Sequence, residues 1–238
     1  MDPVLARHDE PLVEGRVVDR PNRFVLTVDI DGRSERVYLA DPGALAFLEP
    51  GVNVLCSPVA DTTRSTDWDA IAAELDDGYV SLKAAFANEL FLAAFRAGLL
   101  PAFEEYRYVD SEPSYPMRGR ADFLLAPSTG DHDVYVEVKS CTHQEGGVGK
   151  FPDRQTKRGR RQLRCLEAVE RGGSEAHVVF VGQHPSITSI APFREVDPAF
   201  AELLGDVAAA GVSIHGIATA FTPPTYHLLD DDIPVSVG

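Results

Sequence analysis

The first third of the chain alternates apolar and polar residues with a period of two, which is typical of β-strands that bury one face. Turn residues interrupt the alternation, and the Asp31-Gly32 step is a strong signal for a tight hairpin. Several short strands at this spacing predict a small barrel or a curved sheet. The predicted strands cover residues 12–18, 23–30, 35–39, 52–58, 69–75 and 78–80.

From Ser81 onward the pattern becomes helical. Residues 82–97 are apolar on almost every side and are followed by Gly98, which predicts a mostly buried helix. Strands and helices then alternate, and the order β-α-β followed by α-β predicts a mixed sheet flanked by helices. The remaining predicted strands are 103–109, 120–125, 134–140, 176–182 and 212–218, and the remaining helices run from 151 to the Gly172-Gly173 pair and from 197 to 210.

Three charged residues lie in two neighbouring predicted strands: Asp122 in one, and Glu137 and Lys139 in the next. Residues two apart on a strand point to the same face, so Glu137 and Lys139 are expected side by side. If the two strands pair as a hairpin, Asp122 reaches the same edge. Two carboxylates held close together are unfavourable unless a cation joins them. A ligand set made only of oxygen suits Mg²⁺ or Mn²⁺ rather than Zn²⁺.

A simpler interpretation is a surface hairpin on which Glu137 and Lys139 pair with each other, worth about 0–1 kcal/mol. The apolar neighbours Val136 and Val138 favour a buried site instead, because a polar group there needs a partner. Glu89, on the first predicted helix, is either a further metal ligand or a residue that faces solvent.

The segment from Lys150 to Arg164 holds seven Lys or Arg residues and one acid, so its local charge is +6. The helical period places these cations opposite an apolar face. That apolar face consists of Gly159, Leu163, Leu166 and Val169. The cations form either a solvated surface or one that binds a polyanion, since arginine favours bidentate phosphate contacts. The candidate nucleic-acid contacts are Arg154, Lys157, Arg160, Arg161 and Arg164, with Arg20 and Arg23 from the barrel region.

The composition is strongly acidic: the 238 residues carry a formal net charge of −15, with 21 Asp and 16 Glu against 18 Arg and 4 Lys. Such an Asp-rich, Lys-poor surface indicates either a halophilic protein from a high-salt cytoplasm or an ordinary acidic protein. At ~1 M salt the Debye length is about 3 Å, so the net charge does not exclude a polyanionic ligand. Three separated cysteines indicate neither a disulfide framework nor a zinc knuckle. Without a membrane-length apolar run or a signal-peptide pattern, a cytoplasmic location is expected.

The placement of Asp122, Glu137 and Lys139 resembles the PD-(D/E)XK nuclease superfamily, in which Asp, Glu and Lys serve one metal-dependent phosphodiester site. A larger part of the chain resembles the sugar fermentation stimulation protein A family. The resembling segments are Arg20-Pro21-Asn22-Arg23-Phe24, Asp41-Pro42-Gly43, Ala87-Asn88, Arg120-Ala121-Asp122-Phe123, Val136-Glu137-Val138-Lys139-Ser140, Phe151-Pro152-Asp153, Arg158-Gly159 and Ala191-Pro192. Some members of the family have Asn-Thr-Gly at positions 41–43 and a His at the position of Gln162.

The resemblance implies a protein of the α/β (α+β) class with two domains. Residues 1–80 are expected to form an OB-like β-barrel that binds nucleic acid. Residues 81–238 are expected to form a restriction-endonuclease-like mixed sheet flanked by helices. The resemblance also implies DNA binding without marked sequence preference and a role in regulating sugar-utilisation genes.

Two functional hypotheses remain open. In the first, the protein is a nuclease in which Asp122, Glu137 and the Val138 carbonyl hold Mg²⁺ or Mn²⁺, while Lys139 orients or deprotonates the attacking water. In the second, the protein is a DNA-binding regulator that retains the nuclease fold without catalysis. No residue pattern supports a third interpretation, an enzyme of carbohydrate metabolism.

Overall fold

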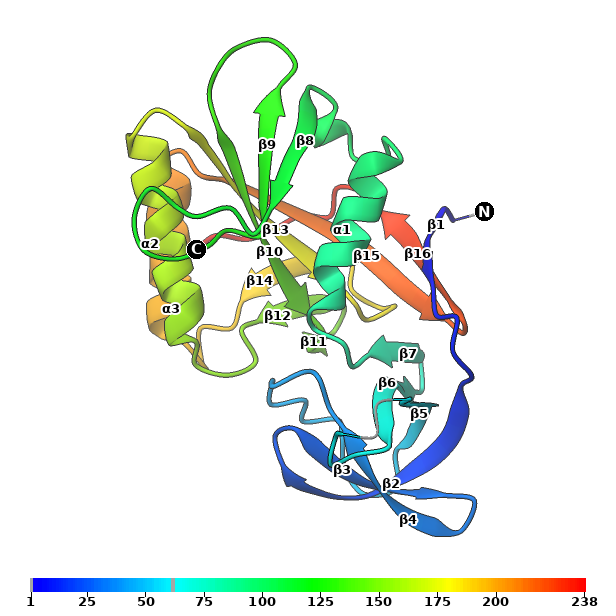
Figure 1. The fold of residues 1–238 in the computed structure, drawn as a ribbon. Coiled ribbons are helices and arrows are strands. Elements are labelled where there is room, and N and C mark those ends of the chain that lie inside the picture. Colours follow the sequence, from blue (N-terminus) through cyan, green and yellow to red (C-terminus); the bar gives the residue numbers. More distant parts are fainter. Residues whose placement is uncertain (1, 61–62) are drawn as a thin grey trace.

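The N-terminal part of the computed structural model, which describes residues 2–60 and 63–238, is a closed five-stranded barrel (Figure 1). Its strands follow the order β4-β3-β2-β5-β6, and a parallel pairing of β4 with β6 closes the barrel. The bounds are β2 (Val13–Asn22), β3 (Val25–Ile30), β4 (Arg33–Tyr38), β5 (Asn53–Pro58) and β6 (Trp68–Leu75). The barrel expected from the sequence is confirmed.

Alternation along β3 explains how the barrel obtains its core. Leu26, Val28 and Ile30 are buried, whereas Asp29 between them is exposed. The expected hairpin joins β3 to β4, and both residues of the Asp31-Gly32 turn have positive φ. Such φ values are accessible to Gly and tolerated by Asp, which is why this dipeptide suits the turn.

The larger part of the molecule is built on a mixed sheet. In it β10, β13 and β15 run parallel, and β9 and β8 extend the sheet in antiparallel fashion. The strands are β8 (Tyr106–Ser111), β9 (Phe123–Pro127), β10 (Val134–Cys141), β13 (Glu175–Gly182) and β15 (Ser213–Thr222). On the far side of β15 lie β16 (Thr225–Asp230), paired with β1 (Val4–Arg7), and β7 (Gly78–Ser81), which connects this sheet to the barrel.

Three helices cover the two faces of the mixed sheet (Figure 1). Helix α1 (Phe86–Arg96) lies on one face, and α2 (Lys157–Arg171) and α3 (Pro198–Ala209) pack together on the other. Thr156 and Asp197 cap the N-termini of α2 and α3 by accepting backbone N–H bonds. A small sheet beside them consists of β11 (Gln144–Glu145), β12 (Val148–Phe151) and β14 (Ser189–Pro192), and the 3-10 turn η1 spans Pro101–Phe103.

Strand β10 is buried on both sides and separates two cores. Val134, Val136 and Val138 belong to the core beneath α1, whereas Tyr135 and Cys141 belong to the core beneath α2 and α3. Because side chains alternate along a strand, Glu137 and Lys139 fall on the α2 side. The fold class expected from the sequence, a barrel followed by a mixed sheet flanked by helices, is confirmed.

Several element bounds differ from the sequence expectation. The basic helix begins at Lys157, not at residue 151, because residues 148–151 pair with β14 as a strand and Pro152 follows. The glycine-rich segment before Phe151 forms a defined hairpin, in which β11 pairs with β12. The chain does not end its sheet at residue 218: β15 continues to Thr222, and β16 follows the Pro223-Pro224 pair.

The mixed sheet is thus interior to the molecule and carries a helical layer on each side. Within the described residues, every helix is too short or too polar to span a membrane.

Candidate functional site

Glu137 and Lys139 form a buried ion pair in the middle of β10. Glu137 is 1% exposed and Lys139 is 7% exposed, and Lys139 Nζ lies 2.6 Å from Glu137 Oε1. The pair sits on the α2 side of the strand, as the alternation of β10 requires. Burying two ions is unfavourable unless their remaining hydrogen-bonding positions are satisfied, so the residues around the pair matter.

Two polar side chains from distant parts of the chain complete this pair. Tyr115, in the loop between β8 and β9, donates its hydroxyl hydrogen bond to Glu137 Oε2 at 2.9 Å. Gln162, on α2, donates from Nε2 to Glu137 Oε1 and accepts from Lys139 Nζ at 3.3 Å. Both oxygens of Glu137 are therefore held in place by the protein.

Asp122 lies close to the same part of β10. It directly precedes β9, and its Oδ2 accepts a 2.8 Å hydrogen bond from the backbone N–H of Val138. Asn88, on α1, donates to the other oxygen of Asp122 at 3.0 Å. The expected hairpin of β9 and β10 exists, and it brings Asp122 to the peptide that joins Glu137 to Val138.

The electrostatics of the site follow from this crowding. Burial raises the pKa of Glu137, the nearby Asp122 carboxylate raises it further, and Lys139 opposes both effects. Burial and the Glu137 carboxylate also raise the pKa of Tyr115 strongly, so its hydroxyl remains a hydrogen-bond donor. Two carboxylates beside one ammonium leave an excess of one negative charge.

The atoms that could bind a metal ion here are all oxygens. Two carboxylates and the neighbouring Val138 carbonyl are hard ligands of the kind that Mg²⁺ and Ca²⁺ use, and Mg²⁺ commonly takes only one or two protein carboxylates. In the described part of the chain, no group of three or more His, Cys, Asp or Glu side chains could hold a metal ion. Asn88 is the α1 residue that contacts Asp122, whereas Glu89 beside it is exposed. These residues fit an oxygen-liganded divalent cation.

Helix α2 presents most of its cations to solvent. Lys157, Arg158, Arg161 and Arg164 are exposed, while the predicted apolar face, Gly159, Leu163, Leu166 and Val169, is buried. Arg160 differs from these cations, because its Nη1 donates to both carboxylate oxygens of the buried Asp197 at the start of α3. Arg160 therefore connects two helices.

The three other candidate arginines lie near the barrel. Arg20 donates to the carbonyl oxygens of Gly43, at 2.9 Å, and of Ala44, and Arg154 donates to Pro42 O at 2.8 Å. Arg23 is exposed, and its guanidinium lies 4.5 Å from the centre of the Phe24 ring. Arg20 and Arg154 thus both contact the loop that contains Asp41-Pro42-Gly43.

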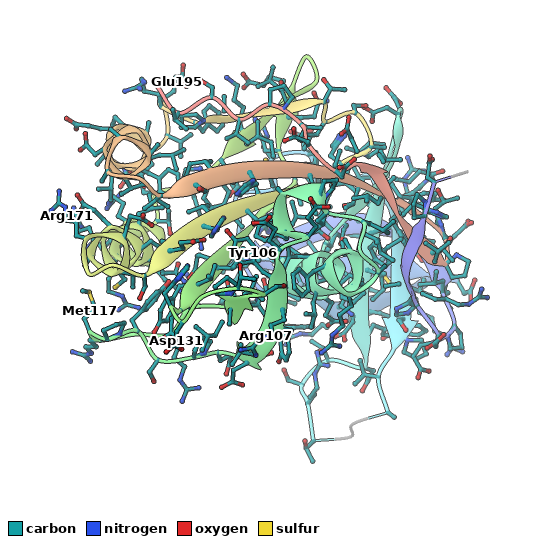
Figure 2. The ribbon with its side chains drawn as sticks, turned by 90° about the horizontal axis from the view of Figure 1, so that it is seen from above. Tyr106, Arg107, Met117, Asp131, Arg171 and Glu195 are labelled. Atoms are coloured by element: carbon teal, nitrogen blue, oxygen red, sulfur yellow. The ribbon has the colours of Figure 1, made fainter. Side chains whose placement is uncertain are left out.

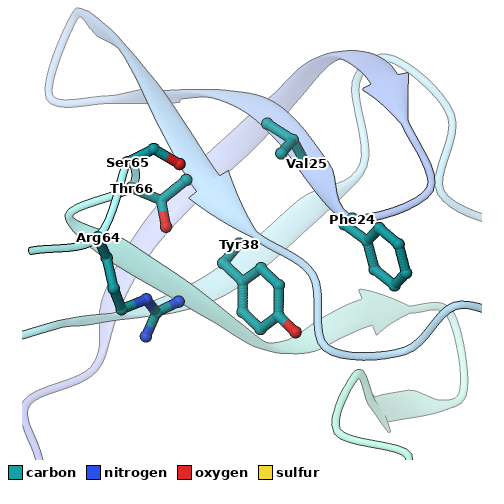
Figure 3. A pocket seen from close by; sticks show the side chains of 6 residues that line it. All are labelled: Phe24, Val25, Tyr38, Arg64, Ser65 and Thr66. Atoms are coloured by element: carbon teal, nitrogen blue, oxygen red, sulfur yellow. The ribbon is translucent and has the colours of Figure 1, made fainter.

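A shallow pocket of about 630 Å³ opens on the barrel beside Phe24 (Figure 3). The Arg64 guanidinium lies over the ring of Tyr38, 4.9 Å from the ring centre. The lining residues are Phe24, Val25, Tyr38, Arg64, Ser65 and Thr66. Aromatic rings interleaved with arginine are typical of surfaces on which bases stack.

Sequence reasoning missed three residues of the site. Asn88 carried a signal, since it is a polar residue within an otherwise apolar helix. Gln162 carried a weaker one: it is three residues after Gly159, on the buried face of α2. Tyr115 carried none, because it lies in a loop, and only the folded chain brings its hydroxyl to Glu137.

Comparison with known proteins identifies what this arrangement is similar to. Residues 18–82 match the family model described as the SfsA N-terminal OB domain, and residues 85–225 match the one described as the sugar fermentation stimulation protein RE domain. The sugar fermentation stimulation protein homolog of Moorella thermoacetica is 37% identical over 92% of this chain and 94% of its own length. The homolog of Chloroflexus aurantiacus is 35% identical, covering 94% and 86% of the two chains.

A solved structure with the same architecture comes from Pyrococcus furiosus. SfsA of that organism, in complex with Ca²⁺, superposes with a TM-score of 0.90 at 28% sequence identity, over 98% of this chain and 99% of that one. The likeness extends over both the barrel and the mixed sheet.

Proposed function

The chain belongs to the sugar fermentation stimulation protein family, and we propose that it binds DNA and cleaves phosphodiester bonds with a divalent metal ion at Asp122, Glu137 and Lys139. The observation that carries the proposal is the buried Glu137–Lys139 pair beside Asp122. A charged pair less than a tenth exposed contributes little net stability, so chemistry is a better reason for its presence. The OB and RE domain matches support nucleic acid as the partner.

Asp122, Glu137 and the Val138 carbonyl would hold the divalent cation, which we propose is Mg²⁺ or Mn²⁺. The Ca²⁺ complex of the Pyrococcus furiosus relative supports a site for a divalent cation. When bound, such an ion lowers the pKa of water and stabilises the charge that develops on phosphate oxygens.

The chain's own residues prepare this site. Lys139 Nζ donates to Glu137 Oε1 and lies 3.4 Å from the Val138 carbonyl oxygen, where it can orient a water molecule or take part in its deprotonation. Tyr115 and Gln162 fix the Glu137 carboxylate from two sides, and Asn88 fixes Asp122. A site whose ligands are held in advance needs little reorganisation when the substrate arrives.

The nucleic acid would be held by cations of the second domain and by the barrel. We propose that Lys157, Arg161 and Arg164 on α2, with Arg154, contact the phosphate backbone. On the barrel, the Arg23 guanidinium lies over the ring of Phe24, which lines the pocket shown in Figure 3. We propose that an unpaired base stacks there. We propose DNA with little sequence preference, because these contacts address the backbone and not the base edges.

A second candidate function is a non-catalytic DNA-binding regulator of sugar-utilisation genes. One observation favours it: both oxygens of Glu137 already accept hydrogen bonds from Tyr115, Lys139 and Gln162. A carboxylate that is satisfied within the protein is also what a retained but inactive site would contain.

An assay of strand cleavage distinguishes the nuclease from the non-catalytic regulator. Wild type, Glu137→Gln and Lys139→Ala are incubated with single- and double-stranded DNA and RNA, with Mg²⁺, with Mn²⁺ and with a chelator. Glu195→Gln is the control, because Glu195 is an exposed glutamate that Figure 2 places at the periphery of the molecule. For a nuclease, cleavage falls by orders of magnitude in both site variants, and the control matches wild type.

Binding measured in chelator supplies an independent readout. DNA affinity of Glu137→Gln should equal or exceed that of wild type, because a negative charge near the phosphates is removed. Equal traces of cleavage in all four preparations would indicate a contaminating nuclease, and the regulator would then be the better assignment.

A further inference from the structure

A cavity of about 230 Å³ lies between the β8–β9 loop and helix α2, beside the acid site. Its lining residues are Glu112, Tyr115, Arg118, Gly119, Arg120, Arg158, Arg161, Gln162 and Cys165. Tyr115 and Gln162 line the cavity and also contact Glu137, so the cavity adjoins the proposed catalytic centre directly.

Positive charge dominates this cavity. Arg118 and Arg120 come from the loop, and Arg158 and Arg161 come from α2. The only acid in the lining, Glu112, pairs with Arg120 at 3.2 Å, and both side chains are more than two thirds exposed. Among the residues that the structure describes, no ion pair joins an acid to Arg118, Arg158 or Arg161. Four arginines and one glutamate give the cavity a formal charge of +3.

The loop that supplies half of these arginines is held against α2. Cys165 Sγ contacts the carbonyl oxygen of Arg118 at 3.8 Å, and the loop closes on itself through a 3.0 Å bond from Tyr115 N to Gly119 O. The Tyr115 ring stacks on Tyr135 of β10. Figures 1 and 2 both place this loop next to α2, and Met117 at its tip is labelled in Figure 2. The backbone that carries the loop arginines is therefore held beside α2 before any ligand binds.

We propose that this arginine-lined cavity binds the terminal phosphate of a nucleic-acid strand whose chain passes the acid site. The inference rests on the proposed function, because it specifies which part of that substrate lies next to the cleavage site. Arginine presents donors that match phosphate oxygens in bidentate fashion.

Charge and size both favour a terminal phosphate. A phosphomonoester carries a charge of about −1.5 to −2 near neutral pH, which suits a +3 cavity better than the single charge of an internal phosphodiester. The cavity, at about 230 Å³, is smaller than the roughly 300–1,000 Å³ that is usual for ligand pockets, and this small size suits a phosphate group. An enzyme that holds the terminal phosphate in this cavity would cleave its substrate near the end of the strand.

The experiment compares a short single-stranded oligonucleotide with a 5′-phosphate, a 3′-phosphate or hydroxyls at both ends. Dissociation constants are measured in chelator at one fixed salt concentration for wild type, for Arg158→Ala/Arg161→Ala and for the control Arg107→Ala/Arg171→Ala. Arg107 and Arg171 are exposed arginines of the same domain that lie outside the cavity lining (Figure 2). Both double variants remove two positive charges, and circular dichroism checks that each is folded.

Wild type and the control should bind one of the two phosphorylated oligonucleotides at least about tenfold more tightly than the oligonucleotide with two hydroxyl ends. A preference of this size is expected for charge-assisted hydrogen bonds. The cavity variant should lose that preference, and inorganic phosphate should reduce it in wild type by competition. Equal affinities of wild type for all three oligonucleotides, or a preference that survives in the cavity variant, would overturn the proposal.

This assay and the cleavage assay can fail separately. A phosphate preference without metal-dependent cleavage would leave the cavity assigned and remove the nuclease. Metal-dependent cleavage without a phosphate preference would support the nuclease and reject the assignment of the cavity.

Discussion

Glu137 and Lys139 are buried ions, and the residues that surround them are best understood through the free energy of removing those ions from water. An uncompensated buried charge is strongly destabilising, and Tyr115 and Gln162 supply the hydrogen bonds that the pair cannot make with itself. Gln162 is especially suited to this place because an amide both donates and accepts. It serves the carboxylate with one group and the ammonium with the other.

Replacing Gln162 with Leu should therefore destabilise the protein. The substitution keeps the size of the side chain and removes both polar groups, so we expect the free energy of unfolding to fall by about 1–3 kcal/mol. Gln155→Leu is the matched control, because Gln155 is exposed just before α2 and should change stability by no more than about 0.5 kcal/mol. Denaturant unfolding measures both. If both variants lose equally little free energy of unfolding, the hydrogen bonds of the Gln162 amide do not contribute to stability.

The same residues mark the limit of what the sequence could tell. The period of two in β10 placed Glu137 beside Lys139, and the turn after β9 brought Asp122 toward them, since both are local effects. The contacts from Tyr115 and Gln162 bridge 22 and 25 positions and depend on how a loop and a helix pack on the sheet. No local pattern encodes that packing. The structure therefore enlarges the predicted triad with residues that only tertiary structure identifies.

Helix α2 carries arginines in two different environments: Arg160 is part of an ion pair inside the molecule, and the neighbouring arginines are exposed. Arg160 bonds both oxygens of Asp197, and Asp197 also caps α3 and accepts from the backbone N–H of Thr156. Arg161 and Arg164, on the same helix, are exposed. Charge alone could not separate these arginines in the sequence, because the partner of Arg160 lies 37 residues away.

Arg160→Ala should reveal the structural role. It leaves Asp197, 1% exposed, without its cation, and breaking a buried pair in this way costs about 3–5 kcal/mol. Arg164→Ala, four positions further along the helix, removes the same charge from the surface and should cost no more than about 0.5 kcal/mol. Denaturant midpoints compare the two variants, and similar losses of stability would argue against the ion pair as the connection between α2 and α3.

The proposed contact of α2 with nucleic acid is tested with a variant that leaves Arg160 in place. Lys157→Ala/Arg161→Ala/Arg164→Ala should weaken binding to every DNA sequence about equally, and it should reduce the slope of log affinity against log salt by up to about 0.9 per lost phosphate contact. Titrations over a range of KCl concentrations give the slope. If a folded triple variant keeps both affinity and slope, α2 is a solvated face.

At the scale of the whole molecule, motifs that are far apart in the sequence meet where the barrel contacts the second domain. Asp153 Oδ2 accepts from the backbone N–H of Leu45 at 3.0 Å, and Arg154 donates to Pro42 O. A Cβ added to Gly43 would lie 2.6 Å from the Asp153 carboxylate, so a larger residue there would displace that carboxylate. These contacts give the Asp41-Pro42-Gly43 and Phe151-Pro152-Asp153 motifs a common structural reason, which their positions in the sequence do not reveal.

Asp41 makes this junction sensitive to pH. Its pKa is raised from 3.8 to about 6, chiefly by burial and also by the nearby Asp153 carboxylate, while the Gly43 N–H and Arg20 oppose the shift. Between these two values the folded protein binds more protons than the unfolded chain, so the free energy of unfolding falls as pH rises through that window. Above it, the ionised Asp41 carboxylate costs about 3 kcal/mol, which is two pKa units at about 1.4 kcal/mol each.

Asp41→Asn should therefore stabilise the protein near neutral pH. The amide oxygen can still accept from Gly43 N–H, and it carries no charge at any pH, so the gain should reach about 3 kcal/mol above pH ~6 and vanish below pH ~4. Denaturant unfolding across this pH range measures the difference between variant and wild type. Asp231→Asn, in the exposed tail, should show no such pH-dependent difference. A difference for Asp41→Asn that stays constant with pH would mean that Arg20 compensates the ionised carboxylate fully and that the junction does not respond to protons.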